Sequence, residues 1–580
     1  MADGKGEQLP DTVLAMLQAR IGRLPARERA VLRAAGIFGP RFWRGGVQAL
    51  LSPPFSQEEI DHGLETLEQE EFIEKQSGSQ FPGETEFMFR HALMSEAAYS
   101  LIPPEDCKLS HRSAAAYLCE IREADAAVIA DHLYRSDEPK RAVPHYMQAA
   151  MLCVQKLDLQ GLMRLSRASE SAGAEGSDLA LSRAGQVMAL FWRNDLEGVL
   201  ELGHAPVMEQ IVGKAHWYTV LGICVLASGM LGRPMVTADL LRRMMMSTPQ
   251  PESSSAFVRA AGLIVVILSV AGMRDLVRLQ LARIETMAQL AAELDPLARA
   301  WALQAQHMFL EHLDADPYRA LMAGQDAGLL FSRYGDHRGQ LTVYGMTAIA
   351  QGAMGDVGGA IKIVRECFKI AKEYEAQFVT LTARSQLCQV LVMSAEPDLV
   401  EEAQREAQKL LETGGGSRHH VGLAHSVSAE ALRKLGRLDE ALVQVELARQ
   451  VLTALPIWRL DALRTQLLIL LELERVDALR PLLAEVAQQL AMYTPSGRHE
   501  IPLRLALAEA CLFCGETERA RAELRTTLQQ IALRASRIPD PKLRRKFIDY
   551  IPDHISARQL AQQWQVEFDM SAAIEKGLQG

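Results

Sequence analysis

Two cysteines near the end of the chain, Cys511 and Cys514, form a C-x-x-C motif, an arrangement that binds zinc or exchanges disulfides in many proteins. They also continue an apolar stripe that begins at Leu503 and Leu507, in the positions i, i+4, i+8 and i+11 of one helix face. A zinc site needs further ligands, and no second ligand pair lies nearby in the sequence. We therefore interpret both cysteines as core residues of a helix.

Four histidines, His91, His111, His132 and His145, follow one another at spacings of 20, 21 and 13 residues. A metal site on a helix usually places its histidines one turn apart. None of these spacings does so, which favours histidines that cap helices or lie in the core. The sequence therefore predicts no metal site and no cofactor.

A glycine run at residues 414–416 precedes Arg418, His419 and His420 and has the composition of a loop that cradles an anion. The run lies in phase with the regularly spaced turns described below. This position favours a flexible linker between repeats.

The motifs that phosphoryl transfer needs are missing from the sequence. The P-loop pattern G-x-x-x-x-G-K-[ST] does not occur, and the early pair Gly4-Lys5 opens no such loop. A kinase catalytic loop places an Asp after His-Arg, but His111-Arg112 is followed by Ser113. We therefore expect that this chain is not an enzyme.

The elements that position these residues are predicted to be helices, separated from about residue 150 onward by regularly spaced turns. The turns recur every 38 to 42 residues, at Asn194-Asp195, Gly232-Arg233, Gly272-Met273, Asp314-Ala315, Gly355-Asp356, Glu396-Pro397, Gly436-Arg437, Arg475-Val476 and Gly515-Glu516. A period that stays constant over so many repeats is typical of a solenoid. About 40 residues accommodate two helices and two turns, so each repeat is predicted to be a helix pair.

The turn chemistry resembles that of the tetratricopeptide repeat (TPR). Gly436 stands where a first helix must reverse, and the small Ala441 follows five residues later, at the start of a second helix. The resemblance implies an all-α solenoid of TPR-like pairs, although the period of about 40 residues exceeds the 34 of that family. An unrelated helical array is the alternative. The residues expected to build the repeat turns are Gly232, Gly272, Gly355, Ala360, Gly436, Ala441, Gly515 and Ala520.

The first 100 residues follow a different pattern. They predict a short β-hairpin after helices, with the elements Leu9–Gly22, Pro25–Gly36, Trp43–Leu51, Ser56–Gln69, Phe72–Lys75 and Glu86–Arg90. Ser56 and Glu59 have the spacing of a capping box. This is the layout of a winged helix, but eight acidic residues and one Lys lie between Gln57 and Lys75, which argues against DNA binding.

Composition narrows the range of partners. The formal charge of −10 gives no global attraction to nucleic acid, and eight cysteines in 580 residues are too sparse for a disulfide framework. The longest uncharged apolar run, residues 260–273, is shorter than the ~20 residues of a membrane-spanning helix, so we interpret it as a buried helix. The polar N-terminus lacks the apolar core of a signal peptide. We therefore expect a cytoplasmic location and no membrane partner.

Longer stretches carry a more specific resemblance. Four runs, LPDTVLAMLQARIGRLPARERAVLRAAGIFGPRFW, FPGETEFMFRHALMSEAAYSLI, HRSAAAYL and IADHLYRSDEPKRAVPHYMQAA, resemble the segment that follows the nucleotide-binding module in bacterial signal-transduction ATPases with numerous domains (STAND). The closing residues 540–564 resemble the end of such proteins. Such proteins are often fused to serine/threonine kinases or adenylate/guanylate cyclases. The resemblance implies a domain order of winged helix (1–103), connecting helices (104–150), TPR-like superhelix (151–535) and capping helices (536–580).

The sequence thus predicts a non-catalytic regulatory and protein-interaction arm of an ATP-dependent signalling protein. Its expected partners are proteins, or a nucleotide-binding module in the same or another chain. Two alternatives stay open: a free-standing TPR-like scaffold and a winged-helix transcriptional regulator. In the main prediction the chain works beside an ATPase. In the two alternatives it binds protein partners without an ATPase, or it binds DNA.

Overall fold

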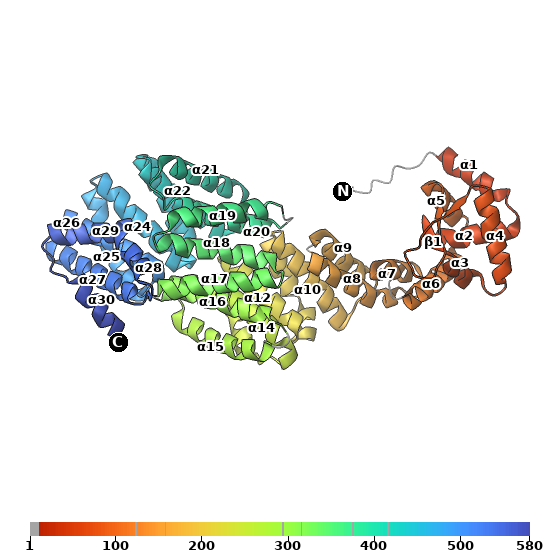
Figure 1. The fold of residues 1–580 in the computed structure, drawn as a ribbon, viewed down its shortest axis with the longest axis horizontal. Coiled ribbons are helices and arrows are strands. Elements are labelled where there is room, and N and C mark those ends of the chain that lie inside the picture. The colour runs from red at the N-terminus through yellow and green to blue at the C-terminus, as the bar shows by residue number, and fades with distance from the viewer. Residues whose placement is uncertain are drawn as a thin grey trace. The chain divides into compact units, whose positions relative to one another are not determined.

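The structure is a computed structural model that describes residues 11–121, 125–156, 158–292, 295–314, 316–373, 376–414 and 417–579. The chain divides into two compact units, Met1–Gln186 (unit 1) and Val187–Gly580 (unit 2). Helices dominate both units, and the only sheet in the described part of the chain is small (Figure 1). The predicted fold class, an all-α solenoid after a small helix-and-strand region, is confirmed.

Unit 1 combines helices with a three-stranded sheet. Its elements are α1 (Asp11–Gly22), α2 (Ala26–Ile37), β1 (Arg41–Trp43), α3 (Arg44–Leu51), α4 (Gln57–Gln69), β2 (Ile73–Lys75), β3 (Glu86–Phe89), α5 (Ala92–Ser100), α6 (Pro104–Glu120), α7 (Ala126–Arg135), η1 (Pro139–Arg141), α8 (Ala142–Lys156) and α9 (Leu159–Ser171).

The sheet corrects one prediction from the sequence. Strand β1 lies where the sequence predicted only the approach to a helix, and it pairs antiparallel with β3 in the strand order β1-β3-β2. Phe42 pairs with Phe87, and their stacked rings lie 5.6 Å apart in the core. A strand of three residues is too short to show alternation, so pairing with β3 and burial of Phe42 decide its conformation.

The predicted capping box of α4 is confirmed. The Glu59 amide donates to Ser56 Oγ at 3.2 Å, and the Ser56 amide donates to Glu59 Oε2 at 3.0 Å. Ile60, Leu64 and Leu67 then bury one face of α4 in the core of unit 1. The remaining positions of the helix are largely acidic or exposed, as the sequence indicated.

From α10 onward the helices form consecutive pairs. The first helices of the pairs are α10 (Gly176–Trp192), α12 (Ala215–Met230), α14 (Ser254–Val270), α16 (Leu297–Leu313), α18 (His337–Ala353), α20 (Gln377–Leu391), α22 (Arg418–Lys434), α24 (Pro456–Glu472) and α26 (Glu500–Phe513). The second helices are α11 (Leu196–Gly203), α13 (Pro234–Met246), α15 (Arg274–Ala291), α17 (Pro317–Arg333), α19 (Val357–Ala371), α21 (Pro397–Thr413), α23 (Leu438–Val451), α25 (Val476–Tyr493) and α27 (Thr517–Ser536).

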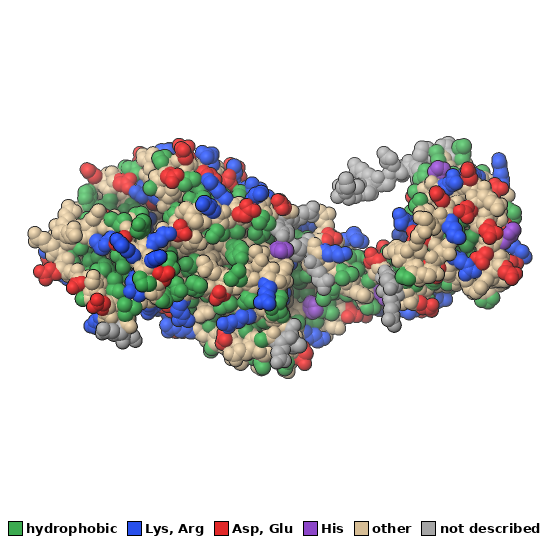
Figure 2. Space-filling model, in the orientation of Figure 1, with side chains coloured by type: hydrophobic (Ala, Val, Ile, Leu, Met, Phe, Trp, Pro, Cys, Tyr) green, Lys and Arg blue, Asp and Glu red, His purple; other side chains and the backbone are tan. Residues whose placement is uncertain are grey.

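Four short 3₁₀ segments and three closing helices complete the unit. They are η2 (Pro206–Ile211), η3 (Pro251–Ser253), η4 (Leu452–Ala454), η5 (Gly497–His499), α28 (Pro541–Asp549), α29 (Pro552–Gln563) and α30 (Met570–Gln579). Helices α28, α29 and α30 pack on α27 and cover its apolar side, which a terminal repeat would otherwise expose. On the face of unit 2 seen in Figure 2, basic and acidic side chains intermix.

The two helices of a pair differ in how they are buried. Helix α21 buries Val400, Ala403, Ala407 and Leu410, which recur every three or four residues on one face. Helix α14 is instead buried on almost every side, because it packs against α12, α15, α16 and α24. First helices are therefore the inner layer of the solenoid, and second helices are the outer layer.

One described helix, Pro251–Val270, is long and apolar enough to cross a membrane by length and composition. In the structure 78% of its most apolar window is buried inside the protein. The helix contains most of the apolar run at 260–273, for which the sequence predicted a buried helix. Residues 271–273 form the turn that follows it.

The repeat turns have a common backbone conformation. Gly232, Gly272, Gly355, Gly436 and Gly515 all have positive φ values, between 67° and 91°, and each lies between the two helices of one pair. Asn194 and Glu474 adopt the same left-handed conformation at φ 62° and 55° in other pairs. The small residues that follow three of these glycines are completely buried: Ala360, Ala441 and Ala520.

The turn at Gly436 gives a matched test of this backbone requirement. Gly436 has φ 75° with open space around it, whereas Gly358 lies exposed in the first turn of α19 with ordinary helical geometry. We expect Gly436→Ala to lower the free energy of unfolding by about 1 kcal/mol, because a Cβ strains the left-handed region. Gly358→Ala should raise it by about 0.5–1 kcal/mol. Urea unfolding measures the change in unfolding free energy, which should be negative for Gly436→Ala and positive for Gly358→Ala. Equal changes in both variants would contradict the left-handed turn at Gly436.

Candidate functional site

The inner helices of unit 2 line a central cavity with two adjoining chambers. The first, which we call the apolar chamber, has a volume of about 150 Å³. The second, the charged chamber, has a volume of about 310 Å³. Glu311, Gln389, Leu423 and Arg498 line both chambers and form the wall between them. The pairwise repeat therefore builds a hollow interior.

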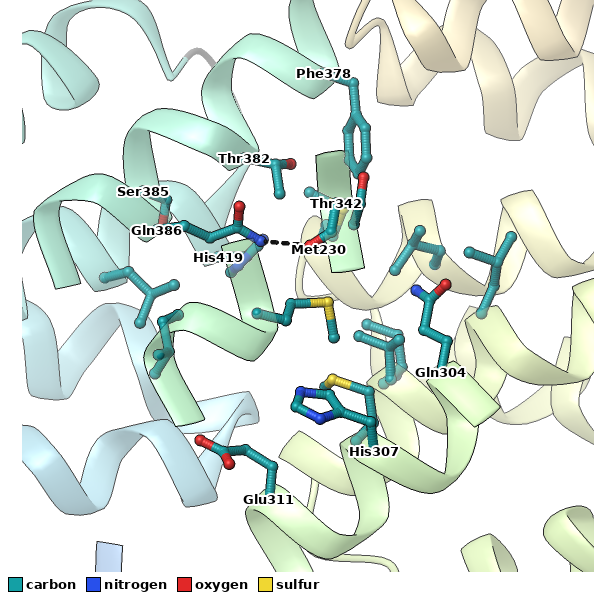
Figure 3. A pocket seen from close by; sticks show the side chains of 18 of the residues that line it. Met230, Gln304, His307, Glu311, Thr342, Phe378, Thr382, Ser385, Gln386 and His419 are labelled. Carbon is teal, nitrogen blue, oxygen red and sulfur yellow. Dashed lines mark hydrogen bonds between the residues drawn. The ribbon is translucent and has the colours of Figure 1, made fainter. Parts of the chain in front are cut away.

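Helix α16 contributes one polar face to the apolar chamber. Gln304, His307 and Glu311 stand at i, i+3 and i+7, so they lie above one another on the same side of the helix (Figure 3). His307 Nδ1 donates to the carbonyl of Ala320 at 2.8 Å. In the neutral ring this bond leaves Nε2 as a hydrogen-bond acceptor.

Helix α20 faces α16 with a second set of side chains. Phe378, Thr382 and Gln386 follow one another at i, i+4 and i+8, and Figure 3 shows them opposite the α16 residues. Gln386 Nε2 donates to the carbonyl of Thr342 at 3.1 Å, which fixes the orientation of the carboxamide. The Oε1 atom of Gln386 is then the free end of the amide.

Aromatic rings form much of the remaining wall. The Phe378 ring lies 4.5 Å from that of Phe191, and His419 stacks on Trp458 at 4.6 Å with an interplanar angle of 20°. The Arg338 guanidinium lies 4.3 Å from the centre of a Trp192 ring. Such walls favour flat, apolar groups.

Several polar atoms of this lining have no hydrogen-bond partner among the described residues. They are Gln304 Oε1, His307 Nε2, Glu311 Oε1, Thr382 Oγ1, Gln386 Oε1, Trp301 Nε1 and Arg498 Nε, although Glu311 Oε1 and Arg498 Nε form an ion pair. The side chains of Gln304, His307 and Gln386 are only 5%, 0% and 4% exposed. More than nine in ten buried polar groups are paired in folded proteins, so a cluster of unpaired ones needs an explanation.

The charged chamber has the opposite character, because its charges neutralise one another. Glu430 pairs with Arg433 at 2.8 Å and with Arg464 at 3.6 Å, and Arg464 also reaches Asp553 at 3.3 Å. Lys434 donates to the carbonyl of Val392 at 2.7 Å. Burial alone would raise the pKa of Glu430, but hydrogen bonds from Arg433 and the charge of Arg464 outweigh it and lower that pKa to about 2.

The cavity exists because the solenoid closes on itself within unit 2. Helix α14 packs against α24, and α16 packs against η5, so helices far apart in the sequence lie side by side. The Arg274 guanidinium donates to the carbonyl of Thr494 at 3.2 Å and also to that of Pro495. Residues 493–499, which we call the closure segment, thus bind the start of α15.

The closure segment also contacts the end of α16. Arg498 pairs with Glu311 at 2.9 Å, with side chains only 15% and 6% exposed. His499 contacts Asp461 Oδ1 through Nδ1 at 2.7 Å and His312 through Nε2 at 3.1 Å. At Gly497 a Cβ atom would overlap the carbonyl oxygen of Glu311, so the approach of the two backbones requires glycine.

The repeat-turn residues named from the sequence have different surroundings. A Cβ at Gly272 would meet the ring of Tyr493 in the closure segment, and one at Gly355 would approach Ile551. Gly232 lies against the Arg418 side chain. Gly436 and Gly515 face open space. These glycines shape turns, and Gly272 also supports closure.

The C-x-x-C cysteines lie in the core of α26 and its turn, as the sequence indicated. Cys511 is 0% and Cys514 8% exposed, and both are free thiols. Burial raises the pKa of Cys511 to about 11 and also raises that of Cys514, so both stay protonated at neutral pH. Among the described residues, no three His, Cys, Asp or Glu side chains group to hold a metal ion.

The core interpretation is confirmed for two of the four histidines. His111 and His132, 1% and 6% exposed, lie on α6 and α7 and meet in the core of unit 1, with their Nδ1 atoms 2.9 Å apart. Burial lowers their pKa values to about 4 and about 3. His419 and His420 belong to the first turn of α22, so the linker interpretation is wrong for them. Residues 415 and 416 of the glycine run lie outside the described residues, as do Gly4 and Lys5.

No sequence pattern predicted the polar residues of the apolar chamber. Gln304, His307 and Gln386 match no motif, and each looks like an isolated polar residue in an apolar helix. One signal was present: α16 and α20 carry amides and imidazoles at helical spacing on helices that must be inner ones. The spacing alone does not predict that α16 and α20 face each other across the chamber.

Comparison with known proteins adds distant likenesses in fold. No family model matches the sequence, and no curated protein matches it. Among solved structures, the Cut9–Hcn1 complex of the APC/C matches at 13% identity and TM-score 0.43, covering 84% of this chain and 92% of that one. A Rap protein with competence and sporulation factor matches at 11% and 0.40, covering 60% and 99%.

A third likeness is to the STAND protein PH0952 of Pyrococcus horikoshii, which has a tetratricopeptide repeat sensor. It matches at 12% identity and TM-score 0.34, covering 89% of this chain and 64% of that one. Likenesses this distant carry no argument about function. The repeats of this chain are TPR-like in architecture.

Closure can be tested with two glycines that share a positive φ. Gly497 has φ 51° and Gly515 φ 85°, but only at Gly497 does a Cβ meet backbone across the closure. We expect Gly497→Ala to open the ring, with faster amide hydrogen exchange in residues 304–313 and 493–499. Gly515→Ala should cost only the local strain of about 1 kcal/mol. Equal exchange in both variants would contradict the closure.

Acid should weaken unit 2 through its buried histidines. Burial lowers the pKa of His420 to about 4, whereas an unfolded histidine titrates near 6.5. Between these values the unfolded chain binds more protons, so stability falls as the pH falls. We expect His420→Phe to reduce by about 2 kcal/mol the loss of unfolding free energy between pH 7 and pH 5. The exposed His337→Phe is the control, and an unchanged loss in His420→Phe would refute the assignment.

Proposed function

We propose that this chain is a non-catalytic regulatory and protein-interaction arm whose central cavity takes a ligand. The observation that supports this most directly is the closure of the solenoid around a cavity that polar side chains of the inner helices line. The groups available there are amides, hydroxyls, imidazoles and aromatic rings, which are means of binding. Ligand binding and ring closure share Glu311 and Arg498, so each is expected to influence the other.

The arm is proposed to act beside a nucleotide-binding module of the STAND type, in a bacterial protein linked to a serine/threonine kinase or cyclase. Support comes from the sequence resemblance of the runs within residues 9–150 and of residues 540–564. This sequence contains no P-loop pattern, so another segment or another chain must supply the nucleotide site. Closure of unit 2 would then set which surface reaches that module.

Crosslinking of the full chain in its native lysate, followed by mass spectrometry, tests this proposal. We expect the crosslinked partners to contain a P-loop ATPase core. The yield of these crosslinks should change at least fivefold in Gly497→Ala and stay unchanged in Gly515→Ala, because only the former disturbs closure.

Two outcomes would count against the proposal. Partners without any P-loop would favour the free-standing scaffold. An equal crosslink yield in both variants would mean that closure of the ring does not influence partner binding. Purified chain at saturating Mg-ATP is expected to show no turnover, and turnover would refute the non-catalytic role.

A further inference from the structure

Unit 1 has a cleft of its own, with a volume of about 380 Å³. Residues of α5 and α7 line it, together with His111 of α6, the end of α2 and the turn that follows α2. Small-molecule sites have volumes of roughly 300–1,000 Å³. Helices α2 and α5 pack closely beside the cleft, because a Cβ atom at Gly36 would lie 3.1 Å from the amide nitrogen of Tyr99. The cleft is therefore held by the packed core of unit 1.

Two almost completely buried side chains reach this cleft with an unpartnered polar atom. Ser95 of α5 is 4% exposed, and His132 of α7 is 6% exposed. Neither Ser95 Oγ nor His132 Nε2 has a hydrogen-bond partner among the described residues, and neither atom is enclosed by the protein. Both atoms therefore open into the cleft that their residues line. Buried polar groups are usually paired, so this pair of open atoms indicates a binding site.

A chain of hydrogen bonds decides what His132 offers to a ligand. Cys107 Sγ donates to the Tyr99 hydroxyl at 3.2 Å, and this hydroxyl lies 3.0 Å from His111 Nε2. Burial lowers the pKa values of His111 and His132 to about 4 and about 3, so both rings are neutral at pH 7. The Tyr99 hydroxyl donates to His111 Nε2, and His111 Nδ1 donates to His132 Nδ1 at 2.9 Å. Nε2 of His132 is then the protonated nitrogen, a hydrogen-bond donor that faces the cleft.

Charged side chains of both signs also line the cleft. They are Glu96 of α5, and Asp131 and Arg135 of α7. All three are exposed, and none forms an ion pair among the described residues. Asp131 and Arg135 are one helical turn apart, a spacing that suits an ion pair, but Asp131 instead accepts a hydrogen bond from the Tyr146 hydroxyl at 2.7 Å. A ligand with a negative and a positive group can pair with both signs at once.

The rest of the lining is largely apolar. Ile37, Phe38 and Pro40 come from α2 and the turn after it, and Val128 comes from α7. Val128 is 43% exposed, so an apolar group in the cleft would remove part of its surface from water. The cleft thus combines buried donors, both signs of charge and an apolar wall.

We propose that this cleft binds a free amino acid with an apolar side chain. Its carboxylate accepts hydrogen bonds from His132 Nε2, Ser95 Oγ and the Arg135 guanidinium. Its ammonium group pairs with Glu96 and Asp131, and its side chain covers the apolar wall. The site goes beyond the proposed function, because it belongs to unit 1 whereas the proposed ligand cavity belongs to unit 2. Binding joins α5 to α7 and stabilises their packing by mass action.

Leucine and two of its truncated forms test the chemistry of the ligand. Isocaproate has the leucine skeleton without the ammonium group, and isoamylamine has it without the carboxylate. We expect leucine to bind the full chain at least tenfold more tightly than either in isothermal titration calorimetry, because each truncated form leaves one part of the site unpaired. Leucine should also shift the imidazole nitrogen signals of His132 in NMR spectra, since Nε2 gains an acceptor.

Three substitutions locate the binding. Arg135→Gln and Ser95→Ala each remove a contact to the carboxylate, so they should weaken leucine binding at least tenfold and threefold, respectively. Glu96→Gln weakens only the contact to the ammonium group, so it should reduce the preference for leucine over isocaproate at least threefold. The controls Arg23→Gln and Ser171→Ala change the same residue types at exposed positions of unit 1 outside the cleft, and they should leave binding unchanged. If Ser95→Ala fails to fold, the exposed Arg135→Gln and Glu96→Gln still decide the question.

Three results would overturn the site. They are no binding of leucine at millimolar concentration, equal binding of leucine and its truncated forms, and unchanged binding in Arg135→Gln. The crosslinking experiment with Gly497→Ala tests the proposed function separately, because Gly497 belongs to unit 2. Crosslinks to a P-loop ATPase without leucine binding would support the interaction arm and refute the amino acid site. Selective leucine binding without such crosslinks would support the amino acid site and count against the signalling role.

Discussion

The contact between the closure segment and the end of α16 determines whether the inner helices of the solenoid face an open groove or a cavity. Helix pairs that stack with a constant period would by themselves leave the inner helices facing an open groove. Here Gly497 lets two backbones touch, and Arg274 holds the carbonyls of the same segment from α15. The groove becomes a cavity, and Gln304, His307 and Gln386 on its wall are buried.

Closure of the ring depends in part on the buried ion pair of Arg498 and Glu311. Arg498 and Glu311 are almost completely buried, and the Coulomb attraction of a buried pair is largely offset by the desolvation of both ions. Closure through such groups is therefore less stable than closure through apolar side chains of equal volume. Burial keeps the pKa of His312 well below its usual range, so this residue takes part in the closure as a neutral ring.

The sequence predicted the features whose contacting residues are close together along the chain. Periodicity and turn chemistry are local, so the helix pairs, the left-handed turns and the capping box of Ser56 and Glu59 could be derived. Strand β1 was missed because three residues show no alternation. The closure was missed because Arg274 and Thr494 lie 220 residues apart, and no local pattern encodes that pairing. The His111–His132 pair depends on the packing of α6 and α7 in the same way.

The sequence did not predict the apolar chamber for a further physical reason. In each repeat, the residues that the period constrains are those between the two helices of a pair, such as the completely buried Ala441. Gln304, His307 and Gln386 lie on the inner faces, where an apolar residue would satisfy the repeat equally well. Each unpaired buried polar group costs about 1–3 kcal/mol of stability. Natural chains depart from the most stable choice chiefly at functional sites, so polar residues on these inner faces are better explained by binding than by folding.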